Sequence, residues 1–396
     1  MNFELSQEQK ILQKTVRDFC ARNVIPNAAR WNEESRFPHE IIAPIAGLGL
    51  LGIHIPERYG GAGMGMLDLC VAVEEVSRGD ASLGLTVASH NLLCMDHIYL
   101  AGNEEQRKTY LPRLASGSAL GAWCLTEPDS GSDAGAARTR AVRQESSDGG
   151  KDGGISGTRW VLNGNKSFIT QGSVAQVYVV IASTTPARRQ KGLTAFVVEK
   201  GTPGLRTGRL IQKMGLWSSD TADVVIDDVV VPDSQRLGQV DSGFFDTTKV
   251  LDRGRIGIGA WAVGIGRAAY EAALSYAQQR VQFGKPIAEF QAIRTMLADA
   301  ATELEAARLL VYRAAVMQDR GERTTRESSV AKYYAGQAAV RACNSALQIH
   351  VGYGYTREFP VERYLRDVKL AEVGEGTNEI QKLVIAREVI KGASMV

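Results

Sequence analysis

The spacing of apolar residues changes twice along the chain. In the first 120 residues the spacing is helical, as where Leu12, Val16 and Phe19 share one face. Residues 121–236 instead hold short runs rich in Val, Ile and Thr between Gly, Asp and Asn turns, which is typical of strands. Helical spacing then returns. We therefore expect an α+β fold with an N-terminal α-helical domain (residues 1–120), a middle antiparallel β domain (121–236) and a C-terminal four-helix-bundle-like domain (237–396).

The same patterns predict individual elements. Expected helices of the first domain cover Leu5–Val24, Pro38–Leu51, Asp68–Leu83 and Asn103–Ala115. Expected strands cover Thr139–Val142, Trp160–Leu162, Val177–Ile181, Leu193–Val198 and Val224–Val231. Expected helices of the last domain cover Arg255–Gln279, Phe290–Gln318, Ser328–Leu347, Pro360–Lys369 and Asn378–Lys391. Glu145–Gly157 is almost wholly Ser, Asp, Gly and Lys, which predicts a solvent-facing hairpin loop.

Charge, hydropathy and cysteine content exclude several classes of protein. The 46 Lys and Arg residues nearly balance the 44 Asp and Glu residues, and no segment concentrates one sign, so we expect no nucleic-acid partner. The longest apolar stretch, Ile41–Pro56, is shorter than the ~18 residues that span a bilayer, so we expect no membrane segment. The N-terminus does not resemble a signal peptide and the five cysteines form no C-x-x-C pair, which predicts a cytoplasmic, reducing location and no metal site.

Gly47, Gly49 and Gly52 satisfy the G-x-G-x-x-G pattern of dinucleotide-binding folds. That pattern needs a strand before it and a helix after it, whereas here a helix is expected before it and Pro56 follows closely. We interpret the motif as a helix C-terminal turn with close packing. The sequence also lacks a G-x-S-x-G nucleophile elbow, a P-loop and an H-E-x-x-H motif.

Two segments at the edge of the strand region offer polar groups to a ligand. Thr126–Gly135 combines hydroxyls, small residues and backbone N–H groups, which suits either a phosphate or flavin edge or a polar domain junction. Asn163–Thr170 predicts a turn and then a strand, where Phe168 either faces a planar cofactor or belongs to the core. Residue types alone leave both choices open.

Near the C-terminus, Glu375 stands between Gly374 and Gly376, and Thr377 can cap the helix that follows. A lone acidic residue is common at a helix N-terminus because the helix dipole favours it there. The flanking glycines, however, allow a ligand to approach the backbone closely, which favours a functional carboxylate. The Gly-rich run Gln348–Tyr355 indicates either a helix-end turn or a second ligand contact.

Taken together, these segments resemble the acyl-CoA dehydrogenase family over nearly the whole chain. Thr126–Asp133 is similar to the family's T-E-P-x-x-G-S-D signature. Arg280-x-x-Phe283-Gly284, Gln348–Tyr355 and Glu375–Gln381 resemble later signatures in the same order. The resemblance implies FAD held between the middle and C-terminal domains, with a neighbouring subunit completing the site, and therefore a homo-oligomer, as a dimer of dimers.

The resemblance also implies site residues. Glu375 would be the catalytic base that takes the α-proton of an acyl-CoA thioester. Implied cofactor contacts are Trp123, Leu125, Thr126, Ser132, Phe168, Thr170, Arg280, Phe283, Gln291, Gln348, Gly352, Thr377 and Glu379. Implied substrate contacts are Ser132, Asp252, Arg255, Gly374, Gly376 and Arg387.

One family alternative for the base is excluded by the residue present. Some relatives place it on the long helix just before an Arg, where this chain has Gly254, and a glycine cannot take a proton. A free Glu titrates near ~4.3, so we expect desolvation by bound substrate to raise its pKa. Many relatives have Tyr before the catalytic Glu; Gly374 leaves space there, and we expect a short- or branched-chain acyl group, including cyclic or aromatic groups.

The expected reaction is FAD-dependent α,β-dehydrogenation to the trans-2-enoyl-CoA, with electron-transferring flavoprotein as acceptor. An acyl-CoA oxidase-like or enoyl-CoA reductase activity on the same fold is an alternative. A flavin-free scaffold is a further alternative, from a different class of function.

Overall fold

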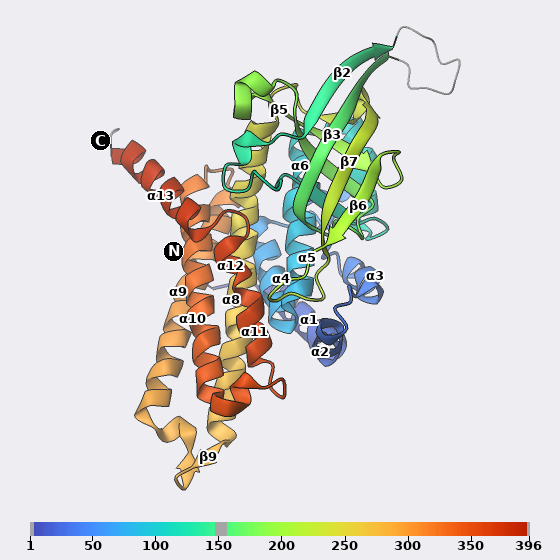
Figure 1. Cartoon of the computed structure of the whole chain (residues 1–396). Helices are drawn as coiled ribbons and strands as arrows, with labels where there is room; N and C mark the ends of the chain where they lie inside the picture. The colour runs from blue at the N-terminus through green and yellow to red at the C-terminus, as the bar shows by residue number, and fades with distance from the viewer. Residues whose placement is uncertain (1–3, 147–156, 394–396) are drawn as a thin grey trace.

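The computed structural model describes residues 4–146 and 157–393 and shows helices, then a sheet, then helices (Figure 1). The first domain contains α1 (Gln7–Phe19), α2 (Ile25–Glu33), α3 (His39–Gly47), α4 (Met66–Gly79), α5 (Ala81–Ser89), α6 (Asp96–Ala101) and α7 (Glu104–Ala115). Two π-helical turns, Cys20–Val24 and His90–Met95, join α1 to α2 and α5 to α6. The predicted helical class of this domain is confirmed.

Three predicted helix boundaries are wrong. The helix expected to begin at Arg255 begins twelve residues earlier, at Gly243. The expected helix Asp68–Leu83 is two helices, because Asp80 adopts an extended backbone and its Oδ1 accepts a hydrogen bond from Leu83 N (2.7 Å), which starts α5. The helix expected over Pro38–Leu51 ends at Gly47. Gly49 then takes a positive φ of 75°, as the predicted C-terminal turn requires.

The middle domain is one sheet with strand order β6-β7-β3-β2-β4-β5-β8. Its strands are β1 (Gly121–Cys124), β2 (Arg140–Ser146), β3 (Gly157–Thr170), β4 (Val177–Ser183), β5 (Leu193–Glu199), β6 (Leu205–Leu210), β7 (Thr221–Pro232) and β8 (Arg236–Leu237). Most pairs are antiparallel, but β4 is parallel to β1 and, at one bridge, to β2. The sheet is therefore mixed. In the chain, β3 follows β2 and runs in the opposite direction, and β4 then runs in the same direction as β2.

The hairpin loop predicted over Glu145–Gly157 falls mostly outside the described residues. Its two ends are described, and they belong to paired strands: β2 and β3 are antiparallel, with Ser146 opposite Gly157.

The C-terminal domain is built on three long helices, α8 (Gly243–Gln279), α9 (Gln291–Asp319) and α10 (Thr325–His350), which lie side by side (Figure 1). A small hairpin of β9 (Val281–Gln282) and β10 (Lys285–Pro286) stands at one end. The short helices α11 (Val361–Val368) and α12 (Leu370–Val373) lead to α13 (Asn378–Ala393). No described helix has the length and apolar character needed to cross a membrane.

The two helical domains share one core. Apolar residues of α1, α4 and α5 pack in the same buried cluster as those of α8, α9 and α10. At Gly264 of α8 a Cβ atom would lie 2.3 Å from the backbone oxygen of Glu74, so only glycine allows α8 and α4 to approach this closely. Trp261 Nε1 of α8 donates to Ala81 O of α5 (2.7 Å). This packing fixes α8, which carries part of the site described next.

Candidate active site

Glu375 lies in a tight loop between α12 and α13, which we call the base loop (residues 374–377). Glu375 and Gly376 both have positive φ values, 52° and 90°. Their carbonyl groups turn toward α10 and α13: Lys332 Nζ donates to Gly376 O (2.7 Å), and Gln381 Nε2 donates to Gly376 O (2.9 Å) and Glu375 O (3.3 Å). These hydrogen bonds hold a non-glycine residue in a conformation that it rarely adopts.

The Glu375 carboxylate faces α8 at Gly254. A Cβ atom on Gly254 would lie 2.3 Å from Glu375 Oε2 and 3.2 Å from Leu93 Cδ2. Within the described part of the chain, buried Oε2 has no hydrogen-bond partner. Because residue 254 has no side chain, the Glu375 carboxylate can occupy this space. The carboxylate therefore lies near the aliphatic side chain of Leu93.

The surroundings of Glu375 bring its pKa close to neutrality. Burial raises the pKa to about 7, against the opposing effect of the positive charges of Arg255 and Lys332. We expected substrate to supply this desolvation, whereas the protein alone already does so. A carboxylate with this pKa is suited to accept and release a proton at neutral pH.

The predicted substrate contacts on α8 adjoin Glu375. Arg255 is largely buried; its Nη1 lies 3.0 Å from Asp252 Oδ1, and its Nε has no hydrogen-bond partner among the described residues. Asp252 Oδ2 accepts a hydrogen bond from Thr325 Oγ1 (2.6 Å). Arg387 on α13 pairs with Glu388 (3.1 Å), and its charge acts on Arg255. Each of these two arginines is thus paired with an acidic residue.

Several predicted cofactor contacts lie where β1 and β3 end, at the edge of the sheet that the strand ends form. Ser167 N donates to Thr126 O (2.9 Å), which joins the loop after β1 to β3. The Phe168 side chain is 64% exposed and its φ is +58°, so its ring stands off the strand, with Thr170 two residues further on. Of the alternatives left open by the sequence, Phe168 is therefore not a core residue.

The remaining predicted contacts near this edge differ in exposure. Trp123 Nε1 donates to His97 Nδ1 (3.0 Å), which fixes the indole ring. Leu125 is buried in the hydrophobic core, and Ser132 is exposed. Thr377 caps α13 through Ile380 N (3.3 Å), and Glu379 is exposed.

A buried ion pair supports the loop from Thr126 to Asp133, which we call the platform loop. Lys166 Nζ donates to Glu127 Oε1 (2.8 Å), Leu125 O (3.1 Å) and Ile181 O (2.7 Å). The same carboxylate accepts hydrogen bonds from the backbone N–H groups of Arg138 (2.6 Å) and Thr139 (2.8 Å). This network fixes the segments on both sides of Thr126.

A second group of predicted cofactor contacts lies at the far end of the bundle. Arg280 and Gly352 line a cavity of about 470 Å³ there, with Tyr276 and His350. Along α8, Gly254 and Arg280 are 26 residues apart, or about 39 Å at the rise of an α-helix. Figure 1 shows the β9 hairpin and α13 toward opposite ends of the bundle. One chain therefore does not bring this group, Arg280, Phe283, Gln291, Gln348 and Gly352, to Glu375.

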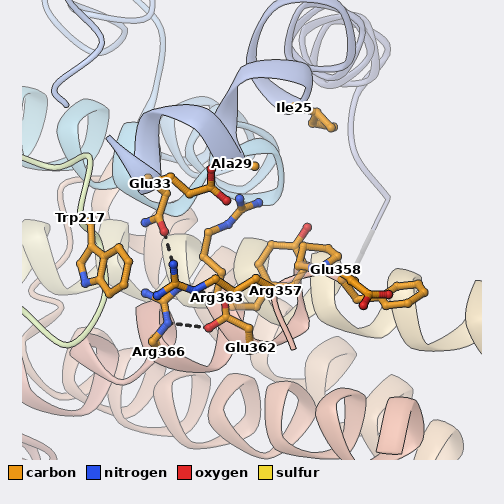
Figure 2. A pocket seen from close by; sticks show the side chains of 13 residues that line it. Ile25, Ala29, Glu33, Trp217, Arg357, Glu358, Glu362, Arg363 and Arg366 are labelled. Atoms are coloured by element: carbon orange, nitrogen blue, oxygen red, sulfur yellow. Dashed lines mark hydrogen bonds and ion pairs between the residues drawn. The ribbon is translucent and has the colours of Figure 1, made fainter. Parts of the chain in front are cut away.

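Another hollow, of about 230 Å³, lies between α2, α11 and the segment around Trp217 (Figure 2). The Arg366 guanidinium lies 4.2 Å from the centre of the Trp217 ring and pairs with Glu362 (2.7 Å). None of the residues predicted for catalysis, cofactor or substrate lines this hollow. It is separate from the Glu375 site.

Sequence analysis named the segments that contain Glu127, Lys166 and Gln381 but gave these residues no supporting role, and it gave none to Lys332 or Leu93. The one available signal was a lone lysine within a segment of small or apolar residues, as at Lys332 between Ala331 and Tyr333. A buried lysine needs acceptors, so such a residue indicates a structured polar contact. No sequence pattern indicated a role for Leu93, because its neighbour on α8, Gly254, is distant in sequence.

Comparison with known proteins decides the family. The descriptions "Acyl-CoA dehydrogenase, N-terminal domain", "middle domain" and "C-terminal domain" match residues 6–118, 122–229 and 241–390. The chain belongs to the acyl-CoA dehydrogenase family. An acyl-CoA dehydrogenase of Bacillus subtilis is 45% identical over 98% of this chain and 99% of its own. The acryloyl-CoA reductase (NADH) of Anaerotignum propionicum is 43% identical over 99% of this chain and 96% of its own.

A solved structure of butyryl-CoA dehydrogenase from Megasphaera elsdenii superposes with a TM-score of 0.94 at 38% identity, covering 98% of this chain and 100% of that one. Members of the acyl-CoA dehydrogenase family are FAD flavoproteins that oxidise CH–CH groups. The predicted family, fold class, enzyme class and cofactor are therefore confirmed.

The described residues fit a flavin on two counts. The sheet edge offers the exposed ring of Phe168 beside hydroxyl groups of Thr126 and Thr170. At the far end of the bundle, a Cβ atom on Gly352 would meet nothing within 4 Å, so its backbone is open to a ligand.

Proposed function

We propose that this chain oxidises the Cα–Cβ bond of a short- or branched-chain acyl-CoA to the trans-2-enoyl-CoA, with Glu375 as the base. The observation that carries the proposal is the Glu375 carboxylate itself. Its side chain is half-buried with a pKa of about 7, it faces Gly254, and its buried Oε2 has no hydrogen-bond partner among the described residues. A carboxylate kept free of partners at this cost is suited to a proton that arrives with substrate.

The base loop provides for both halves of proton removal. The thioester carbonyl acidifies the α-hydrogen, and Glu375 accepts that hydrogen as a proton. Negative charge then develops on the thioester oxygen and needs a donor already in place. Lys332 and Gln381 hold the carbonyl groups of Glu375 and Gly376 and so fix the backbone of the loop, and we assign the Glu375 N–H as the donor to this oxygen.

Thr126, Phe168 and Thr170, with Trp123, Leu125 and Ser132, would hold FAD at the sheet edge. When bound there, FAD supplies the acceptor for the electron pair that leaves Cβ with its hydrogen. Glu375 would then act on Cα from one side of the acyl chain, and Phe168 and its neighbours would hold the acceptor on the other. Thr377 and Glu379 would contact the cofactor beside α13.

The far group of cofactor residues implies a homo-oligomer. Because Arg280 lies about 39 Å along α8 from Gly254, we assign Arg280, Phe283, Gln291, Gln348 and Gly352 to the cofactor of a neighbouring subunit. Phe283 is 93% exposed, as a residue that contacts a partner would be. We infer at least a dimer with shared sites, within a dimer of dimers. Monomers that bind FAD at full strength would contradict the shared site.

The substrate assignment rests on the volume around Glu375. Leu93 and Gly254 border the carboxylate, which suits a small aliphatic group. A Cβ atom on Gly374 would lie 3.3 Å from Leu370 Cγ, so Leu370 takes part of the space that the missing ring leaves. Asp252, Arg255, Arg387 and Ser132 would hold the CoA portion. We therefore favour short or branched acyl groups over bulky ones.

The test is an anaerobic titration of the purified flavoprotein with straight, branched, cyclic and aromatic acyl-CoAs. Bleaching of the oxidised-flavin absorption by a short or branched member, with formation of the enoyl-CoA, is expected. The rate of bleaching should rise with pH through about 7, because only the ionised Glu375 accepts a proton. A preference for a long straight acyl-CoA, or no bleaching by any member, would contradict the proposal.

A second candidate is the reverse reaction. One relative at 43% identity is an acryloyl-CoA reductase (NADH), and the same site can serve both directions because a base that removes the α-proton can also return it. Electron-transferring flavoprotein is the acceptor that we propose for the forward direction. Faster enoyl-CoA reduction than acyl-CoA oxidation would favour the reductase, and one peroxide per product in air would favour an oxidase.

A further inference from the structure

Lys332 is the buried charge nearest to the base loop. It lies on α10 and its side chain is fully enclosed, with 0% of its surface exposed. Among the described lysines, only Lys166 is enclosed to the same degree. Burying an ammonium group costs free energy unless acceptors surround it, so its position requires an explanation.

The Lys332 ammonium joins the two sides of the base loop. It donates to Gly376 O (2.7 Å), at a position where φ is +90°, and lies 3.4 Å from Oδ1 of Asn378, the first residue of α13. One helical turn further along α10, a Cβ atom on Gly336 would lie 3.0 Å from Ala371 O of α12. One face of α10 therefore supports α12, the loop and α13 together.

We propose that Lys332 is a positioning residue, which keeps the base loop in its left-handed conformation and so holds the Glu375 carboxylate over Gly254. This inference rests on the proposed role of Glu375 as the base. It assigns to Lys332 no contact with substrate or flavin, and it makes α10 part of the catalytic apparatus.

The charge of Lys332 adds to its hydrogen bonds. Gln381 already gives Gly376 O a neutral donor (2.9 Å), so the lysine is not needed merely to satisfy that oxygen. The charged groups that act on Lys332 are Glu375, Arg255, Glu372 of α12 and Glu379 of α13. Lys332 and Arg255 both lower the pKa of Glu375 against the effect of burial. Loss of Lys332 should therefore raise that pKa above 7.

The experiment compares Lys332→Met with Lys332→Gln in the purified flavoprotein. For Lys332→Met we expect kcat to fall by roughly ten- to a hundredfold, as misplacement of a reacting group by about 1 Å does, with a smaller change in KM. The ascending limb of the pH profile should move to higher pH. Lys332→Gln keeps a donor and loses the charge, so it should recover part of kcat and retain the alkaline shift.

Lys213→Met is the matched control. Lys213 is partly buried and, like Lys332, donates to a backbone oxygen, Ser219 O (2.9 Å), but it is not among the charges that act on Glu375. The control should leave the ascending limb in place. If Lys332→Met lowers kcat only in proportion to its loss of melting temperature and bound flavin, and its pH profile superposes on that of the wild type, the inference is wrong.

A double variant separates this inference from the proposed function. In the Glu375→Gln background, Lys332→Met should cause no further loss of turnover, because the group that it positions is gone. A further tenfold loss there would overturn the inference and leave Glu375 as the base. High turnover in Glu375→Gln itself would instead overturn the proposed function.

Discussion

The platform loop (residues 126–133) and the base loop (residues 374–377) each depend on a fully buried lysine, but they treat their carboxylates in opposite ways. Glu127 accepts hydrogen bonds from Lys166 and from two backbone N–H groups. Glu375 Oε2 accepts none within the described residues. Burial acts to raise the pKa of each carboxyl group. At Glu127 the charge of Lys166 and the hydrogen bonds outweigh burial, so the pKa is lowered. At Glu375 burial prevails, and the pKa rises to about 7. A satisfied carboxylate anchors structure, while an unsatisfied one remains available to a proton.

Removal of the unsatisfied carboxylate should give the largest effect on activity. Glu375→Gln keeps the shape of the side chain and cannot take a proton, so turnover should fall by about 10²- to 10⁴-fold, the usual contribution of a general base. Single-turnover flavin reduction measures this loss. Flavin content should stay at the wild-type value, because Oε2 had no partner to lose.

The same variant tests how much the Glu375 carboxylate lowers the free energy of unfolding. In the unfolded chain Glu375 ionises near its usual pKa of 4.5, and in the folded protein near 7, so between these values the folded state holds the proton more tightly. Wild-type stability relative to Glu375→Gln should therefore fall as pH rises from about 4.5 to 7, and then stay constant. Denaturant unfolding at several pH values measures it, and a constant difference would refute it.

Changes at the hydrogen-bonded carboxylate, Glu127, should mainly lower folding stability, whereas changes at Glu375 mainly lower activity. Lys166→Met leaves Glu127 buried without its ion-pair partner, which should destabilise the middle domain by about 3–5 kcal/mol. Flavin binding should weaken with it, because Lys166 holds Leu125 O beside Thr126. Replacement of both members, Glu127→Leu with Lys166→Met, should cost less than either single change. A single variant with wild-type unfolding would contradict the comparison.

Gly254→Ala should disturb the base loop without touching its supports. The new methyl group would stand 2.3 Å from Glu375 Oε2, so the carboxylate must move, and we expect kcat to fall by roughly tenfold or more. Gly257→Ala is the matched control on the same helix, because its methyl group would meet only Leu92. The control should lower stability and leave the pH dependence of turnover unchanged. Equal kinetics for the two variants would mean that the Glu375 carboxylate is not confined by Gly254.

Leu93→Ala should have the smallest effect, on substrate choice alone. Its side chain borders Gly254 next to the Glu375 carboxylate, so its removal should admit one or two more carbons. Relative kcat/KM for longer acyl-CoAs should rise by about tenfold, since a methylene in an apolar pocket is worth about 1–3 kcal/mol. The acyl-CoA panel measures this shift, and an unchanged preference would place Leu93 outside the acyl site.

The elements that periodicity predicted well are those whose burial is simple. Val177–Ile181 and Leu193–Val198 fall within β4 and β5, which are buried on both faces and rich in β-branched residues. β1 was missed because its four residues, Gly-Ala-Trp-Cys, have little strand signal and are held by parallel pairing with β4. The break at Asp80 was missed because apolar spacing continues across it.

The site was predictable only as separate segments. The family resemblance singled out Glu375 and showed that Gly254 stands where some relatives have their base. The structure adds that Glu375 and Gly254 are in direct contact. That contact joins residues 121 positions apart and depends on how α10 holds the base loop, which no local pattern encodes. Lys332 and Lys166 stayed hidden because a single lysine in an apolar helix or strand is more often at the surface.

The π-helical turn His90–Met95, which carries Leu93, makes this part of the chain sensitive to its exact length. Such a turn contains one residue more than an α-helical turn. Loss of any one of its residues would let the segment relax into a regular α-helix and rotate everything beyond it by about 100°. Asp96, whose Oδ1 lies 2.7 Å from His54 Nε2, would then face a different neighbour. Substitutions in this turn can retune the proposed acyl site, whereas a one-residue deletion would dismantle it.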